Sequence, residues 1–126
     1  MTLSESREDY LENLLILETR SGGFVRQVDM ASRMGFSKAS ISKAMSSLSA
    51  EGYVEFRPRG LVRLSNGGRK IAERVYDRHC FFFKVLTNLG IPTEIGQRDA
   101  CRMEHAMSEE SYQALKKELS SKMDVQ

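Results

Sequence analysis

The 126-residue sequence contains no tryptophan, only two prolines and two cysteines, and no long apolar run. No segment approaches the roughly 20 consecutive apolar residues of a membrane-spanning helix, so we expect no membrane contact. The N-terminus has no basic stretch followed by an apolar one, which indicates no secretory signal and favours the cytoplasm. In that reducing compartment the two cysteines, Cys80 and Cys101, are expected to remain thiols.

An excess of charge of one sign is also missing, because 19 basic and 17 acidic residues leave a net charge of +2. The overall balance therefore does not predict nucleic-acid binding, but the distribution of charge is uneven. Residues 57–74 contain six basic side chains and one acidic side chain, whereas residues 1–18 contain five acidic side chains and one basic side chain. One basic surface and one acidic end would suit DNA at one place and a cation at another.

Apolar periodicity and capping residues predict a mainly α-helical chain. Ser4, Ser37, Ser65 and Ser108 are candidate N-caps, and glycines follow several of the predicted helices. Alternating apolar residues on both sides of Arg57-Pro58-Arg59-Gly60 predict a β-hairpin. The expected helices span about residues 4–21, 28–34, 37–51, 65–88, 93–107 and 108–122.

The second and third predicted helices, separated by Gly35, have the layout of a helix-turn-helix. In such a motif the second helix lies in the major groove of DNA, where small, hydroxyl and basic side chains reach base edges and phosphates. The alternative is a plain helical hairpin with a polar outer face. The candidate DNA-binding residues are Ser37, Lys38, Ala39, Ser40, Ser42 and Lys43.

The β-hairpin that follows would be the wing of a winged helix, and its turn carries Arg57 and Arg59. Arginines at a wing can contact phosphates or the minor groove. The alternative is a solvated turn with no partner. We therefore expect a winged helix-turn-helix DNA-binding domain at residues 1–73 and a helical domain, with metal-binding and dimerisation roles, at residues 74–126.

Cys101, Glu104 and His105 form the most informative stretch of the chain. On a helix, residues three and four apart share a face, so a thiol, a carboxylate and an imidazole would point the same way. Mixed sulfur, oxygen and nitrogen ligands favour a transition metal over Mg²⁺ or Ca²⁺. Spacing alone leaves open whether they bind a metal, and a site would need ligands from elsewhere.

Three further residues are candidate ligands. Asp9 and Glu12 are carboxylates one turn apart on the first predicted helix, although they could simply stabilise the positive end of that helix. His79 is the other histidine of the chain, and an isolated histidine is more often an ordinary structural residue. Cys80 is expected to pack in the core or at an interface, and Met103 and Met107 are expected to pack in the core.

Along nearly its whole length the chain resembles the diphtheria toxin repressor and manganese transport regulator family. The matching segments are Glu8-Asp9-Tyr10-Leu11-Glu12, Val28-Asp29-Met30-Ala31, Arg59-Gly60-Leu61-Val62, Arg78-His79, Asp99-Ala100-Cys101-Arg102-Met103-Glu104-His105 and Met107-Ser108. The resemblance implies a homodimer that binds a palindromic DNA operator when activated by metal, usually to repress metal-uptake genes. It also implies that the longer members' C-terminal SH3-like domain is missing.

By motif position, the resemblance assigns metal ligation to Asp9, Glu12, His79, Cys101, Glu104 and His105, with one or two ions per subunit. The chain departs from both main patterns of the family. Manganese-type members usually carry an acid where Cys101 stands, and iron-type members carry Met where Asp9 stands. Phe83 occupies the position of an acidic ligand in the iron-type ancillary site. These features favour Mn²⁺ or Fe²⁺ without choosing between them.

Two other functions compete with metal sensing. The chain could be a winged-helix regulator that senses redox state through Cys101. It could also be a small metalloenzyme, although no nucleophile motif or glycine-rich phosphate loop accompanies the candidate ligands. We therefore expect no enzymatic activity.

Overall fold

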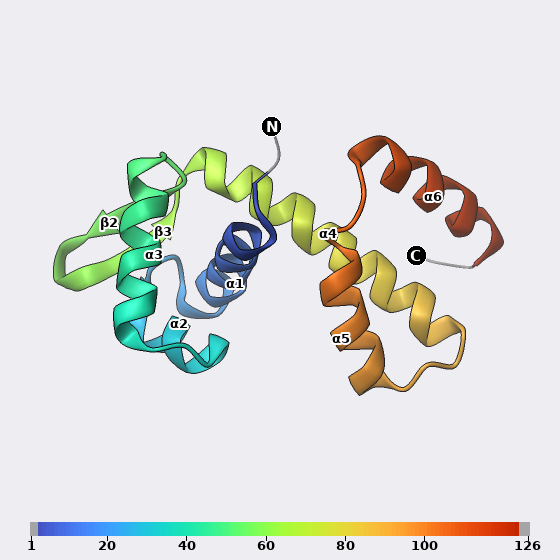
Figure 1. Ribbon diagram of the computed structural model, residues 1–126, viewed down its shortest axis with the longest axis horizontal. Coiled ribbons are helices and arrows are strands. Elements are labelled where there is room, and N and C mark those ends of the chain that lie inside the picture. Colours follow the sequence, from blue (N-terminus) through green and yellow to red (C-terminus); the bar gives the residue numbers. More distant parts are fainter. Residues whose placement is uncertain (1–2, 124–126) are drawn as a thin grey trace. The chain divides into compact units, whose positions relative to one another are not determined.

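The computed structural model describes residues 3–123, and the chain divides into two compact units, Met1–Glu73 and Arg74–Gln126. The mainly helical fold class predicted from the sequence is confirmed (Figure 1). The first unit contains a three-stranded antiparallel sheet. The elements are α1 (Glu5–Ser21), β1 (Val25–Arg26), α2 (Gln27–Met34), α3 (Lys38–Ala50), β2 (Val54–Arg57), β3 (Leu61–Leu64), α4 (Asn66–Asn88), α5 (Thr93–Met103) and α6 (Glu109–Lys122).

The helix-turn-helix of the first unit consists of α2 and α3. Gly35 ends α2 with φ of 72°, a left-handed conformation that glycine adopts without steric cost. Ser37 then caps α3, and its side chain accepts a hydrogen bond from the backbone N–H of Ser40. The abrupt stop and new cap allow the chain to turn between the two helices within a few residues.

The sheet contains one strand that the sequence analysis did not predict. β1 pairs antiparallel with β3, with Val25 opposite Val62, and β2 pairs with the other edge of β3. A two-residue strand is too short to produce an alternating apolar pattern, so its existence depends on the neighbouring strand. This pairing fixes the start of α2 against the wing, which is formed by β2, β3 and the turn Pro58–Gly60.

The core of the first unit is formed by apolar side chains from its helices and its sheet. Leu14, Met30 and Ile41 are fully buried there, with Val62 from β3. A buried carboxylate ties the helices to the sheet, because Glu18 accepts hydrogen bonds from Leu64 N at 2.8 Å and from Arg69 at 2.5 Å.

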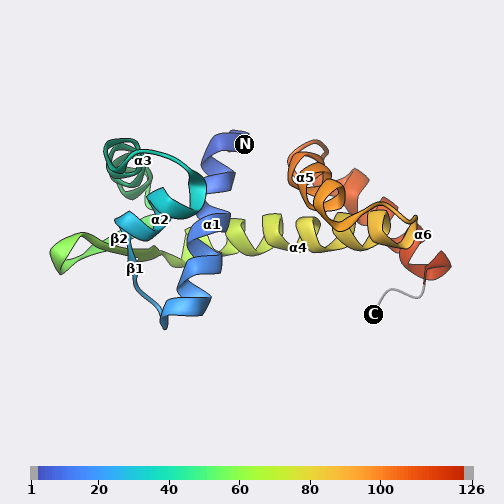
Figure 2. The ribbon, with the colours of Figure 1, turned by 90° about the horizontal axis from the view of Figure 1, so that it is seen from below.

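The second unit is built on the C-terminal part of α4, with α5 and α6 packed against it (Figure 2). Phe81, Phe82, Ala100 and Tyr112 form its buried core. The hydroxyl of Tyr112 donates to Asp77 Oδ2 at 2.6 Å, so α6 is attached to α4 by a polar contact as well as by apolar packing.

One expectation about the second unit was wrong. α5 ends at Met103 rather than near residue 107, since Arg78 donates hydrogen bonds to the carbonyls of Glu104 and Met107 and satisfies them outside a helix. Cys80 is exposed on the face of α4 opposite Phe82, so it does not pack in the core of this unit, and its place at an interface stays a prediction. Among residues 3–123, no helix combines the length and the apolar character that crossing a membrane requires.

Candidate metal centre and DNA-facing surface

Three of the predicted ligands meet within the second unit. His79 lies on α4, Cys101 lies on the last turn of α5, and Glu104 is the C-cap residue that follows α5. His79 Nδ1 is 3.7 Å from Cys101 Sγ and 3.2 Å from Glu104 Oε2. One donor atom from each residue can be chosen so that all three lie within 4.8 Å of one another. The three-residue spacing of Cys101 and Glu104 is what directs both side chains toward α4.

The imidazole of His79 is oriented by a residue that the sequence analysis missed. Its Nε2 is 2.7 Å from Gln97 Oε1, and Gln97 lies one turn before Cys101 on the same face of α5. The ring also stacks between Tyr76 and Phe83. The spacing 97, 101 and 104 is the sequence signal that could have identified Gln97, because a ligating histidine usually has a hydrogen-bond partner on its other ring nitrogen.

The electrostatics of the cluster favour positive charge at its centre. Contacts with Cys101 and Glu104 raise the pKa of His79 to about 11, against the opposing effect of burial. The Glu104 carboxylate is fully buried, with its second oxygen 3.4 Å from Nε2 of His105. A proton on His79 therefore provides positive charge beside a carboxylate that has been removed from water.

The cluster fits a transition-metal ion. An ion that binds nitrogen, oxygen and sulfur donors at about 2.0–2.3 Å holds them within roughly 3–4.5 Å of one another. The thiol, imidazole and carboxylate approach this separation before any adjustment of their rotamers. A magnesium site would instead present oxygen donors, so the composition of the cluster excludes an ordinary Mg²⁺ site.

Of the remaining predicted ligands, His105 belongs to the second unit, and Asp9 and Glu12 belong to the first unit. The side chain of His105 is 4% exposed and follows Glu104 directly, just beyond the end of α5 rather than on it. Asp9 and Glu12 lie one turn apart on α1, in the first unit, and Glu12 is buried.

Arg78, next to His79 on α4, holds the turn that carries Glu104 and His105. Its Nη1 donates to Met107 O at 2.7 Å and to Glu104 O at 3.2 Å. Its guanidinium also lies 4.8 Å from the ring centre of Tyr112. Sequence reasoning assigned Arg78 no role of its own, since nothing local to α4 identifies these partners.

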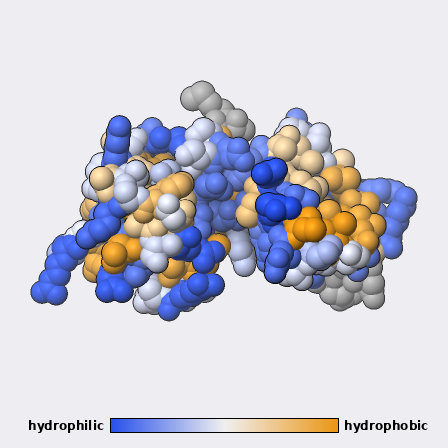
Figure 3. Space-filling model, turned by 60° about the horizontal axis from the view of Figure 1, so that its bottom comes forward, coloured by the Kyte–Doolittle hydropathy of each residue, from blue (hydrophilic) through white to orange (hydrophobic). Residues whose placement is uncertain are grey.

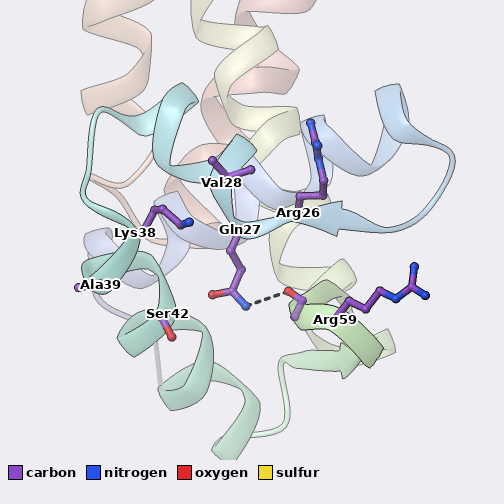
Figure 4. A pocket seen from close by; sticks show the side chains of 8 residues that line it. Arg26, Gln27, Val28, Lys38, Ala39, Ser42 and Arg59 are labelled. Atoms are coloured by element: carbon purple, nitrogen blue, oxygen red, sulfur yellow. Dashed lines mark hydrogen bonds between the residues drawn. The ribbon is translucent and has the colours of Figure 1, made fainter.

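The eight predicted DNA-binding residues are all exposed on the first unit: Ser37, Lys38, Ala39, Ser40, Ser42, Lys43, Arg57 and Arg59. In Figure 3 the outermost end of the first unit is coloured hydrophilic, and hydrophobic patches lie beside it. A hollow of about 490 Å³ opens between α3 and the wing (Figure 4). It is lined by Arg26, Gln27, Val28, Lys38, Ala39, Ser42, Arg59 and Gly60.

The two wing arginines have different surroundings. Arg57 is held on the sheet, with its guanidinium 5.6 Å from the ring centre of Phe24 and 3.9 Å from Glu55. Arg59 extends from the wing turn away from α3 (Figure 4). Arg26 lines the same hollow and pairs with Asp29 at 2.9 Å. It was missed because the strand that carries it was not predicted.

Comparisons with known proteins agree with this division of roles. Residues 2–62 match the family model "Iron dependent repressor, N-terminal DNA binding domain". Residues 65–122 match the family model "Iron dependent repressor, metal binding and dimerisation domain". The chain thus contains a DNA-binding domain followed by a metal-binding and dimerisation domain.

Curated relatives extend the match along most of the chain. It is 38% identical over 109 residues to the transcriptional regulator MntR of Escherichia coli O157:H7, covering 86% of this chain and 70% of that protein. It is 34% identical over 104 residues to the HTH-type transcriptional regulator MntR of Geobacillus kaustophilus, covering 82% and 72% of the two chains.

Solved structures share the fold. The manganese regulator SloR superposes with a TM-score of 0.76 at 23% identity over 95% of this chain and 55% of SloR. T. acidophilum IdeR gives a TM-score of 0.72 at 24% identity over 95% of this chain and 55% of IdeR. These two likenesses concern the fold alone, whereas the identity to MntR and the two matched domains concern the family. The chain belongs to the family of metal-dependent, DNA-binding transcriptional regulators that includes the iron-dependent repressors and MntR.

Proposed function

We propose that the chain senses Mn²⁺ or Fe²⁺ and, when loaded, represses genes for metal uptake. The observation that carries this proposal is the convergence of His79, Cys101 and Glu104, whose donor atoms lie within 4.8 Å of one another. The metal ligands proposed from the second unit are these three residues and His105. A bound divalent ion would supply positive charge beside the buried Glu104 carboxylate.

Asp9 and Glu12 complete the proposed ligand set, with one or two ions per subunit. Their inclusion rests on the sequence motif of α1 and on the burial of Glu12, because a carboxylate removed from water is stabilised by a nearby cation. Ligands on α1 and on the second unit would make metal binding and the placement of the DNA-binding domain interdependent.

The choice between Mn²⁺ and Fe²⁺ depends on opposing preferences of the ligands. The Cys101 thiolate favours softer and later metals, and Mn²⁺ is the weakest binder in the usual order of affinities. The carboxylates favour harder ions. Since the cluster offers both kinds of donor, cellular metal availability would decide which ion occupies it.

The DNA-binding role is assigned to the exposed face of α3 and to the wing. Each subunit presents one α3, so a twofold dimer would place two of them in successive major grooves of a palindromic operator, about 34–36 Å apart. The second unit exposes large apolar side chains that a dimer could cover, among them Leu89 and Ile95, with exposed fractions of 71% and 40%. The proposed location is the cytoplasm, where the operator lies.

The redox alternative receives no specific support from the site. Cys101 faces an imidazole and a buried carboxylate, an arrangement that suits ligation. Cys80 and Cys101 are both free thiols.

The test is fluorescence anisotropy of the metal-free protein on DNA from upstream of its own gene, made anaerobically with Mn²⁺, Fe²⁺ or Zn²⁺ added in turn. Tight binding only with metal is expected, and the ion that acts at its cellular concentration is the signal. Glu104→Gln should remove the metal response and leave helix content unchanged. Glu94→Gln, an exposed carboxylate on α5, is the matched control and should behave as wild type.

Equal DNA binding with and without metal would overturn metal sensing. In that case, loss of binding after thiol oxidation in the wild type, but not in Cys101→Ser, would support the redox alternative.

A further inference from the structure

Gln27 connects the helix-turn-helix to the wing. It is the first residue of α2 and directly follows β1, whose Arg26 pairs with Leu61 on β3. Its side-chain Nε2 donates a hydrogen bond to the backbone carbonyl of Gly60 at 2.8 Å (Figure 4). This bond joins residues 33 apart in the sequence and lies in the hollow between α3 and the wing turn.

The carbonyl that Gln27 holds belongs to an unfavourable turn. Arg59 has φ of 68° and ψ of 26°, and Gly60 follows with φ of 72°. A non-glycine residue in the left-handed region persists where its surroundings over-determine the conformation. Arg59 is the only non-glycine residue with positive φ among residues 3–123, so the wing turn depends on such restraints more than the other turns described.

The conformation of this turn decides where Arg59 reaches. The side chain of Arg59 extends outward from the turn, on the opposite side of Gln27 from Lys38, Ala39 and Ser42 of α3 (Figure 4). When α3 occupies a major groove, a wing arginine contacts the neighbouring backbone or minor groove only if the span between the two is right. Gln27 lies between these two elements and restrains that span.

We infer that Gln27 is a positioning residue for DNA binding, which holds the wing turn so that Arg59 reaches the DNA while α3 occupies the major groove. This inference rests on the proposed DNA-binding function of α3 and the wing. Gln27 acts through Arg59 and not through a DNA contact of its own. Removing the Gln27 side chain therefore leaves the metal ligands unchanged. The wing turn is then less ordered in the free protein, and DNA binding has to order it.

The test is a double-mutant cycle between Gln27→Met and Arg59→Ala, read by anisotropy on operator DNA at saturating metal. Methionine keeps the length of glutamine and removes the donor without adding charge. Gln27→Met should weaken DNA binding about 3- to 10-fold, the effect of one neutral hydrogen bond. In the Arg59→Ala background the same change should alter affinity less than about twofold, because coupled residues are not additive.

Two further measurements separate positioning from general damage. The metal affinity of Gln27→Met should equal that of the wild type, and its thermal unfolding midpoint should fall only by the few degrees that the loss of one hydrogen bond causes. In the free protein, amide hydrogen exchange at residues 59–61 should be faster in Gln27→Met, a readout that needs no DNA. Gln113→Met, on the exposed surface of α6, is the control for the substitution itself and should change none of these quantities.

Wild-type affinity in Gln27→Met would overturn the inference, and so would an equal loss in both backgrounds, which would mean that Gln27 contacts DNA directly. Failure of the wild type to bind DNA would instead overturn the proposed function. In that case unchanged exchange at residues 59–61 in Gln27→Met would still overturn the positioning role.

Discussion

Replacing Arg78 with methionine should destabilise the second unit by about 3 kcal/mol. The two hydrogen bonds from Nη1, to the carbonyls of Met107 and Glu104, come from a charged donor and contribute about 1.5 kcal/mol or more each. The cation–π contact with Tyr112 at 4.8 Å adds roughly 1 kcal/mol. The ion pair with Glu109 adds at most about 1 kcal/mol, because the Glu109 side chain is half exposed.

One contribution acts in the opposite direction. Arg78 Nε is buried, and no hydrogen-bond partner for it occurs within the part of the chain that the structure describes. Methionine would remove this desolvated group, which offsets about 1 kcal/mol of the loss. The sum of the favourable contacts, about 4 kcal/mol, therefore falls to about 3 kcal/mol.

The assay is urea unfolding of the metal-free protein, followed by far-ultraviolet circular dichroism. Arg102→Met is the control, because Arg102 is exposed on α5 and its loss should change stability by less than about 0.5 kcal/mol. Since the turn held by Arg78 carries Glu104 and His105, metal affinity should fall as well. A loss under about 1 kcal/mol, or one equal to that of the control, would refute the role assigned to Arg78.

Three further predictions concern separate parts of the chain. A Cβ on Gly68 would lie 2.0 Å from a backbone carbonyl oxygen, whereas one on Gly67 would meet nothing closer than 3.9 Å. Gly68→Ala should therefore lower the free energy of unfolding by more than about 2 kcal/mol, measured by thermal unfolding, and Gly67→Ala should not. Burial raises the pKa of Asp77, but hydrogen bonds led by the one from Tyr112 outweigh it and leave the pKa below its usual 3.8. The stability that Asp77 contributes is thus present above about pH 4 and lost as the pH falls through the lowered pKa, so the urea midpoint should decline less between pH 5 and pH 3 in Asp77→Asn than in the wild type. Cys101→Ser should weaken Zn²⁺ and Fe²⁺ binding about tenfold or more and Mn²⁺ binding less, by competition with a metal indicator; an equal loss for all three ions would contradict ligation through sulfur.

Local sequence patterns predicted most of the fold because they involve residues only a few positions apart. Ser37 and Gly35 act within one helical turn, so the helix-turn-helix is readable from the sequence alone. The alternating residues of the wing are equally local. The spacing of Cys101 and Glu104 likewise places both on one side of α5, because the period of a helix alone determines which residues share a face.

Contacts between distant residues could not be predicted in this way. The two-residue strand β1 exists because β3 lies beside it. α5 ends at Met103 rather than four residues later, because Arg78 satisfies the carbonyls of the following turn from another helix. Neither cause leaves a periodic pattern near the residues that it affects.

The sequence by itself therefore determined the helices, the wing and the residue types of the metal centre, since each depends on propensities and spacings within a few residues. Only the tertiary structure decided which side chains orient the wing and the metal-centre histidine. Gln97 reaches His79 across 18 residues, and Gln27 reaches the wing across 33. Such partners are selected by the packing of whole elements against one another, because a hydrogen bond requires proximity in space and carries no constraint on separation along the chain.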